Sequence, residues 1–135
     1  VALIIYNQNT GEISYSSGGH QPLVVYRSNK GVYEEYRPKG IPVGLDRNAE
    51  YEDSEFVLNT NDFLILFTDG VPEARNRSGK EYTVEEIKKV CLENKEESSK
   101  KMIQEILDDL DYFHRNSQQW DDQTLFILKR GENIK

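Results

Sequence analysis

Two aspartates lie beside short apolar runs of the sequence, and this arrangement could support metal chemistry. Phe63–Phe67 is a run of five large apolar residues that leads through Thr68 to Asp69, and Asp121 comes shortly before a second run, Leu125–Leu128. Short apolar runs of this kind predict buried strands. If the two strands are antiparallel neighbours, both carboxylates lie at the same end of the sheet. Hard cations such as Mg²⁺ or Mn²⁺ take oxygen ligands of this type, so the pattern predicts half of a metal site.

Each motif also has an ordinary structural explanation. Asp69 is followed by Gly70, and the Asp-Gly pair is common turn chemistry. Asp121 and Asp122 could cap or solvate the entry to a strand. His20 follows two glycines and could be an incidental residue of a tight turn. For each motif taken alone, these alternatives stay open.

Other catalytic and ligand-binding patterns are weaker. His20 and His114 lack a close His or Cys partner, which argues against a zinc site. We find no Ser-His-Asp or Cys-His arrangement and no glycine-rich phosphate loop. Arg75, Arg77 and Lys80 follow the Thr-Asp-Gly turn and could attract phosphate, although a solvated basic loop is the favoured interpretation.

Composition limits the classes of protein that the chain can represent. Its 135 residues fit one domain, and 36% hydrophobic with 30% charged residues fits a globular chain. The net charge of −7 argues against nucleic acid and anionic membranes as partners. A single cysteine, Cys91, cannot form an internal disulfide and favours the reducing cytoplasm. Because residue 1 is Val and residues 1–6 already predict a strand, we expect an excised fragment.

Periodicity places strands in the first half and helices in the second. The predicted strands are residues 1–6, 12–16, 22–27, 32–36, 51–58 and 63–67, and the predicted helices are residues 83–93 and 99–115. Thr83 and Glu86 have the spacing of a capping box, and Ser98 or Ser99 begins the second helix. We expect antiparallel strands with amphipathic helices that cover one face of a sheet, and no cofactor motif in these helices.

Four motifs in a fixed order identify a family resemblance. They are Ser17–Pro22, Gly40–Leu45, Leu66–Ala74 and Asp121–Thr124. With this set the chain resembles the C-terminal part of the bacterial metal-dependent protein phosphatases of the PPM (type 2C) superfamily. Within that superfamily it looks like the branch of stage II sporulation protein E and the stress-response regulator phosphatases.

The resemblance implies a fold, a reaction and a cofactor. It implies that residues 1–135 are the C-terminal portion of one PPM-type domain, an α+β fold in which an antiparallel β-sandwich is flanked by helices, here truncated at its N-terminus. The implied enzyme hydrolyses phosphoserine or phosphothreonine with two Mn²⁺ or Mg²⁺ ions, whose activated water attacks phosphorus directly. Its implied substrate is a phosphorylated protein, such as an anti-sigma-factor antagonist.

Site roles follow from the resemblance one residue at a time. Asp69 matches the metal-binding aspartate of the family's Thr-Asp-Gly motif, and Asp121 matches the metal-binding aspartate of its closing Asp-Asp motif. Asp122 is expected to orient the loop by hydrogen bonds, and Gly70 to serve the backbone. His20 falls in the family's Ala-Gly-His-x-Pro segment, where a structural role and a role at the site both stay open.

The sequence also departs from the family pattern. The early aspartate that bridges the two metals and the Gly-Asp segment around it have no counterpart here. We therefore expect this chain alone to bind metal weakly and to turn over poorly. Two functions remain: a phosphatase seen as an incomplete catalytic domain, or a non-catalytic module that keeps the fold and binds a signalling partner. A dimer stays open as an oligomeric state.

Overall fold

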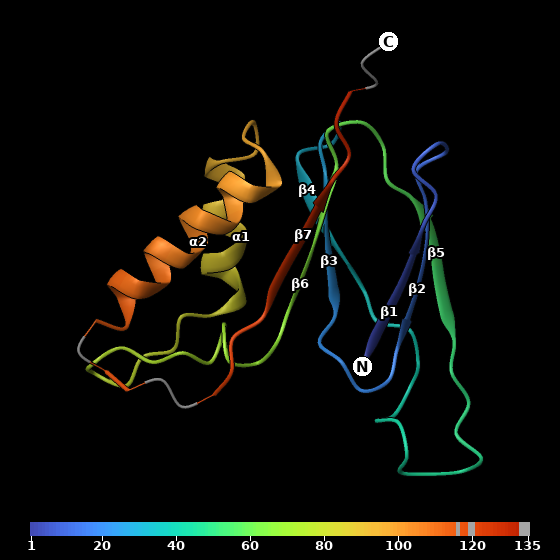
Figure 1. Cartoon of the computed structure of the whole chain (residues 1–135), viewed down its shortest axis with the longest axis horizontal. Helices are drawn as coiled ribbons and strands as arrows, with labels where there is room; N and C mark the ends of the chain where they lie inside the picture. Colours follow the sequence, from blue (N-terminus) through green and yellow to red (C-terminus); the bar gives the residue numbers. More distant parts are fainter. Residues whose placement is uncertain (116, 119–120, 133–135) are drawn as a thin grey trace. The chain divides into compact units, whose positions relative to one another are not determined.

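The computed structural model describes residues 1–115, 117–118 and 121–132, and the chain divides into two compact units (Figure 1). The first unit contains residues 1–65 and 129–135, and the second contains residues 66–128. The chain passes between the units inside one strand and returns at the end of another. Each unit is therefore described by itself.

The part of the chain that the structure describes forms seven strands in two sheets. One sheet has the order β1-β2-β5 and contains β1 (Ala2–Tyr6), β2 (Glu12–Ser17) and β5 (Asp53–Val57). The other has the order β4-β3-β6-β7 and contains β3 (Leu23–Arg27), β4 (Val32–Tyr36), β6 (Phe63–Phe67) and β7 (Leu125–Lys129). The pairs β1–β2, β2–β5, β3–β4 and β3–β6 are all antiparallel. The hairpins of β1–β2 and β3–β4 follow from short turns that each contain a glycine.

The two sheets pack against each other within the first unit. All five residues of β3 are buried, and β2 alternates between buried positions and positions that are exposed or half-buried, so one face of β2 faces the core. Tyr36 of β4 stacks on Phe56 of β5 with ring centroids 4.2 Å apart. This aromatic contact joins the two sheets, which gives the sandwich that the family resemblance implies.

A buried cation forms a polar link across the sandwich. The Arg27 guanidinium donates to Glu34 at 2.8 Å, to Asp62 at 3.0 Å and to the Val57 carbonyl at 2.6 Å. Burial alone would lower the pKa of Arg27, but its bonds to Glu34, Asp62 and Tyr36 raise that pKa above its usual value. Asp62 is only 1% exposed, so Arg27 neutralises a carboxylate that has almost no access to water.

The second unit is built around two helices, α1 (Val84–Glu93) and α2 (Ser99–Phe113), which pack on each other. Their buried residues recur at helical spacing: Ile87, Val90, Cys91, Met102, Ile106 and Leu110. The Tyr82 ring packs on Phe113, and its hydroxyl donates to Asp109 at 2.6 Å. Burial raises the pKa of the Cys91 thiol to about 12.

The structure confirms the predicted α+β class with antiparallel strands and two late helices, but it contradicts the predicted capping box. Thr83 is the N-cap of α1, yet its side chain makes no capping hydrogen bond and its backbone has φ 75°. The Thr83 N–H donates to the Pro72 carbonyl at 2.8 Å, so Glu86 has no donor to reach back to. Ser98 does cap α2, because its hydroxyl oxygen accepts from the Lys101 N–H at 3.2 Å.

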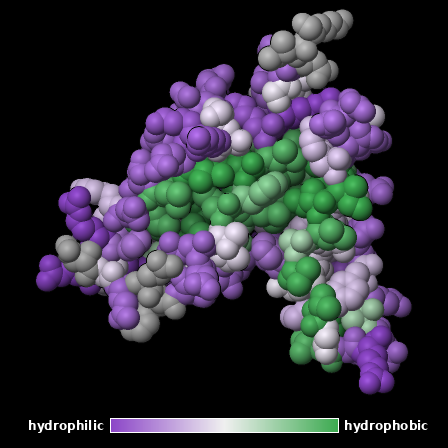
Figure 2. All heavy atoms as spheres, viewed as in Figure 1, coloured by the Kyte–Doolittle hydropathy of each residue, from purple (hydrophilic) through white to green (hydrophobic). Residues whose placement is uncertain are grey.

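Apolar side chains also reach the surface, as Figure 2 shows. In the first unit the most exposed ones include Leu3 and Ile5 on β1, and Val43 and Leu45 in the loop before β5. Among the described residues, neither helix is long and apolar enough to cross a membrane.

The Arg27 network gives a test of what holds the sandwich together. Replacement of Arg27 by Met should lower the free energy of unfolding by about 3 kcal/mol, because it leaves the buried Asp62 carboxylate without its cation. The Arg37→Met variant is the matched control, since the Arg37–Glu35 pair leaves Arg37 69% exposed and should contribute less than about 1 kcal/mol. Urea denaturation measures both. Equal losses of unfolding free energy in the two variants would show that the Arg27 network stabilises the sandwich no more than an exposed ion pair does.

The two helix starts give a second test. The Ser98→Ala variant should lose about 1 kcal/mol of stability, because the Lys101 N–H loses its acceptor. The Thr83→Ala variant removes a hydroxyl that makes no capping bond, so its free energy of unfolding should change by less than about 0.5 kcal/mol. A larger loss of unfolding free energy in Thr83→Ala than in Ser98→Ala would show that the Thr83 side chain does cap α1.

Candidate metal centre

The loops that carry the two predicted aspartates meet in the second unit, where β6 ends and β7 begins. The Thr68 N–H donates to the Thr124 carbonyl at 3.1 Å, and the Thr124 N–H donates to the Thr68 hydroxyl oxygen at 2.9 Å. The Thr68 hydroxyl in turn donates to the Asp122 carbonyl at 3.3 Å. Because Asp69 directly follows Thr68 and Asp121 directly precedes Asp122, these bonds bring the two aspartate-bearing loops together.

Gly70 allows the closest approach of the two loops. A Cβ atom added at position 70 would lie 2.2 Å from the Asp122 carbonyl oxygen and 3.4 Å from that of Asp121. A real Cβ atom does not tolerate the first distance, so any side chain here would force the loops apart. Gly70 is buried, and the lack of space for a Cβ atom explains why glycine occupies this position.

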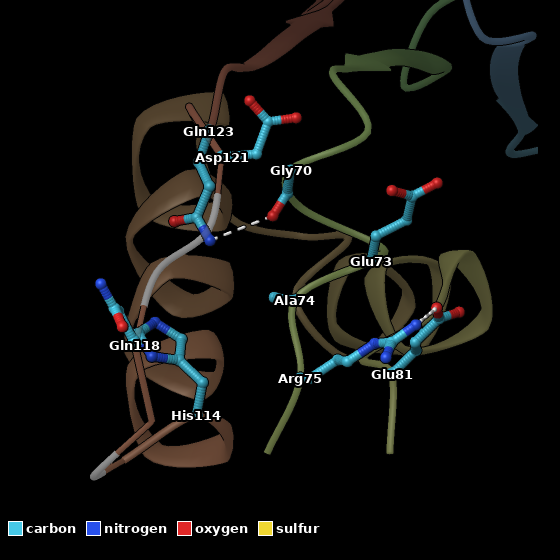
Figure 3. A pocket seen from close by; sticks show the side chains of 9 residues that line it. All are labelled: Gly70, Glu73, Ala74, Arg75, Glu81, His114, Gln118, Asp121 and Gln123. Atoms are coloured by element: carbon cyan, nitrogen blue, oxygen red, sulfur yellow. Dashed lines mark hydrogen bonds and ion pairs between the residues drawn. The ribbon is translucent and has the colours of Figure 1, made fainter. Parts of the chain in front are cut away.

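A side chain also joins the loops. The Gln123 Nε2 atom donates to the Gly70 carbonyl at 3.1 Å, and Figure 3 shows this bond across the top of a pocket of about 270 Å³. The Asp121 carboxylate lies at the same end of that pocket, and the ion pair between Arg75 and Glu81 lies at its other side.

The aspartates present oxygen donors at the surface. Asp69, Asp121 and Asp122 are all exposed, and the Asp121 carboxylate accepts from the Asp122 N–H at 2.8 Å, which restrains its orientation. A pair of exposed carboxylates on loops that are locked together suits a hard divalent cation. Within the described residues, however, no group of three or more His, Cys, Asp or Glu side chains could hold a metal ion. The two carboxylates would fit part of a metal site at most, and their role as metal ligands stays a prediction.

The other predicted residues lie in local structures. His20 belongs to the first unit, where its N–H donates to the Ser17 hydroxyl at 3.0 Å and its Nδ1 lies 3.0 Å from the Gln21 carbonyl oxygen. Arg75 pairs with Glu81 at 3.1 Å, and both side chains are largely exposed. Those contacts agree with a solvated basic loop at Arg75.

Sequence reasoning missed the parts played by Gln123 and by the Thr68 hydroxyl. Both act across a tertiary contact between segments more than fifty positions apart. The available signal is indirect: once β6 and β7 are assumed to be antiparallel neighbours, Thr68 and Thr124 become candidates for a pair.

Comparison with known proteins identifies relatives of the whole segment. The sequence model of the family described as Stage II sporulation protein E (SpoIIE) matches residues 1–131. Among curated proteins, the phosphoserine phosphatase RsbU of Bacillus subtilis (strain 168) is 29% identical over 125 residues. That match covers 93% of this chain and 37% of RsbU, so the chain spans little more than a third of this relative.

Solved structures agree on the fold. The phosphatase domain of the cell fate determinant SpoIIE from Bacillus subtilis, presoaked with Mn, matches with a TM-score of 0.72 and 16% identity, over 100% of this chain and 58% of that one. The SiaA-PP2C domain of Pseudomonas aeruginosa matches with a TM-score of 0.73 and 17% identity, over 95% of this chain and 50% of that one. At these identities the likeness shows the fold alone.

The close approach at Gly70 is open to a direct test. The Gly70→Ala variant should lose about 2 kcal/mol of stability, because its methyl group meets the Asp122 carbonyl oxygen. The Gly131→Ala variant is the control, since a Cβ atom there meets nothing within 4 Å. Urea denaturation of both variants measures the difference. If Gly70→Ala is as stable as Gly131→Ala, the two loops are not held at this distance.

Proposed function

Because the chain belongs to the stage II sporulation protein E (SpoIIE) family, we propose that it forms the C-terminal portion of a metal-dependent protein phosphatase domain that hydrolyses phosphoserine or phosphothreonine. The family match over residues 1–131 and the similarity to a protein named as a phosphoserine phosphatase support the reaction class. The fold of solved phosphatase domains supports the architecture.

One observation carries the proposal at the level of residues: the contact between the Thr-Asp-Gly loop and the Asp121–Thr124 segment. Asp69 and Asp121 are the proposed ligands of Mn²⁺ or Mg²⁺, Asp122 restrains Asp121, and Gly70 gives the loops room to meet. When bound, divalent ions supply an activated water and neutralise the charge that develops on the phosphoryl oxygens. In this proposal the contact between the Thr68 and Asp121–Thr124 segments keeps the two loops that carry these carboxylates together.

Two carboxylates do not complete a two-metal site. We place the remaining ligands, including the bridging aspartate that the family resemblance implies, in a part of the domain outside residues 1–135. The chain spans 58% of the solved SpoIIE phosphatase domain that it matches, which agrees with this division. On this view residues 1–135 alone are nearly inactive.

The proposed substrate is a phosphorylated regulatory protein, such as an anti-sigma-factor antagonist, in the bacterial cytoplasm. The resemblance to stress-response regulator phosphatases supports this choice. The net charge of −7 also disfavours nucleic acid as a partner.

A substitution at Asp69 tests the proposed reaction. In a version of the chain extended to the full phosphatase domain, Asp69→Asn should lower Mn²⁺-dependent hydrolysis of a phosphoserine protein by about 1000-fold, which corresponds to roughly 4 kcal/mol of barrier. Asp69 is exposed, so the fold should survive. The control is Asp53→Asn, which removes the same charge from an exposed position on β5 and should leave the rate unchanged. Release of phosphate over time gives both rates.

The same assay separates the two candidate functions. Residues 1–135 without the extension should show almost no turnover, and vigorous Mn²⁺-dependent turnover by this chain would contradict the division of the site. If the extended chain hydrolyses none of the phosphoproteins offered, the proposal of a phosphatase fails and a non-catalytic module that binds a signalling partner becomes the better explanation.

A further inference from the structure

We propose that Gln123 is a positioning residue, whose side chain sets the spacing of the two loops that carry Asp69 and Asp121. This inference rests on the proposed function, because it concerns how the proposed metal ligands are held. Nothing in the family resemblance assigns a role to the side chain at this position.

The evidence begins with where the amide reaches. Gln123 lies two residues after Asp121, and its Nε2 atom donates to the Gly70 carbonyl at 3.1 Å, one residue after Asp69. The bond therefore joins the two aspartate-bearing loops directly (Figure 3). Gly70 is buried and Gln123 is half-buried, so the bond is partly shielded from competition by water.

The hydrogen bonds that pair the ends of β6 and β7 do not extend to the outer part of either loop. The exchange between Thr68 and Thr124 fixes the backbone at the ends of β6 and β7, but both aspartates lie beyond that exchange, on the turns. Two further contacts act there and oppose each other. The packing of Gly70 against the Asp122 carbonyl limits how closely the loops approach, and the Gln123 bond limits how far they separate.

A spacing limited from both sides should matter more for metal binding than for folding. A single neutral hydrogen bond contributes little to the net stability of a protein, because folding exchanges hydrogen bonds with water for hydrogen bonds within the chain. In contrast, loss of a contact that orients metal ligands commonly weakens metal affinity by 10- to 100-fold. The role of Gln123 therefore predicts that its removal changes metal affinity without a comparable change in stability.

The test compares two glutamines of one pocket in the full chain, residues 1–135. In Gln123→Met the side chain keeps its length but cannot donate, and its dissociation constant for Mn²⁺ should rise about 10-fold. Gln118→Met makes the same change at another glutamine of the pocket wall, for which the structure gives no bond to Gly70, and should bind Mn²⁺ as the parent chain does. Electron paramagnetic resonance of free Mn²⁺ measures the affinities up to millimolar values. Thermal unfolding without metal should give midpoints within a few degrees for all three chains.

The outcomes separate this inference from the proposed function. If Gln123→Met binds Mn²⁺ as tightly as the parent while Asp69→Asn loses binding, the positioning role is wrong and the metal site stands. If Gln123→Met weakens binding only in proportion to a large loss of thermal stability, its role is in folding and the inference fails. If neither Asp69→Asn nor Asp121→Asn changes Mn²⁺ binding, the metal assignment itself is wrong and the inference falls with it.

Discussion

The exchange of hydrogen bonds between Thr68 and Thr124 is the constraint on which the candidate site depends. These bonds set the register in which the end of β6 meets the start of β7. A slip of one residue would turn every side chain of a strand to the opposite face, so the register decides which groups meet at this edge. With the observed register, Gly70 falls against the Asp122 carbonyl, where a Cβ atom would have no room.

The chain uses its acidic residues in two different ways, according to their access to water. Asp62 is buried and fully engaged, because it accepts from Arg27, from the Ser28 N–H and from the Asn59 N–H. A carboxylate with its oxygens so occupied holds the fold together but has little capacity left for a ligand. Asp69 and Asp121 are exposed instead, and their positions are set by the backbone around them. The fold thus buries the carboxylate that pairs with Arg27 and leaves the carboxylates of the proposed metal site exposed.

How much of this the sequence could predict depends on the range of the interactions. Apolar runs such as Phe63–Phe67 predict strands because burial depends mainly on residue type, and both helices follow from their spacing of apolar residues. The Thr83 capping box is wrong because a tertiary bond to the Pro72 carbonyl already occupies the donor that the local pattern requires. The Gln123 contact was missed for a similar reason. Its partner, Gly70, is near only after β6 and β7 have paired, and no local pattern contains that information.

The single cysteine of the chain can report on local opening of the second unit. Cys91 lies on the buried face of α1, it is the only cysteine of the chain, and its raised pKa keeps it protonated at neutral pH. A protonated, enclosed thiol reacts with alkylating reagents only when the helices around it come apart. The rate of alkylation of Cys91 would therefore measure how often the α1–α2 pair opens locally, even when the sandwich of the other unit stays folded. For the same reason, mild oxidants should react with the Cys91 thiol only during such local opening.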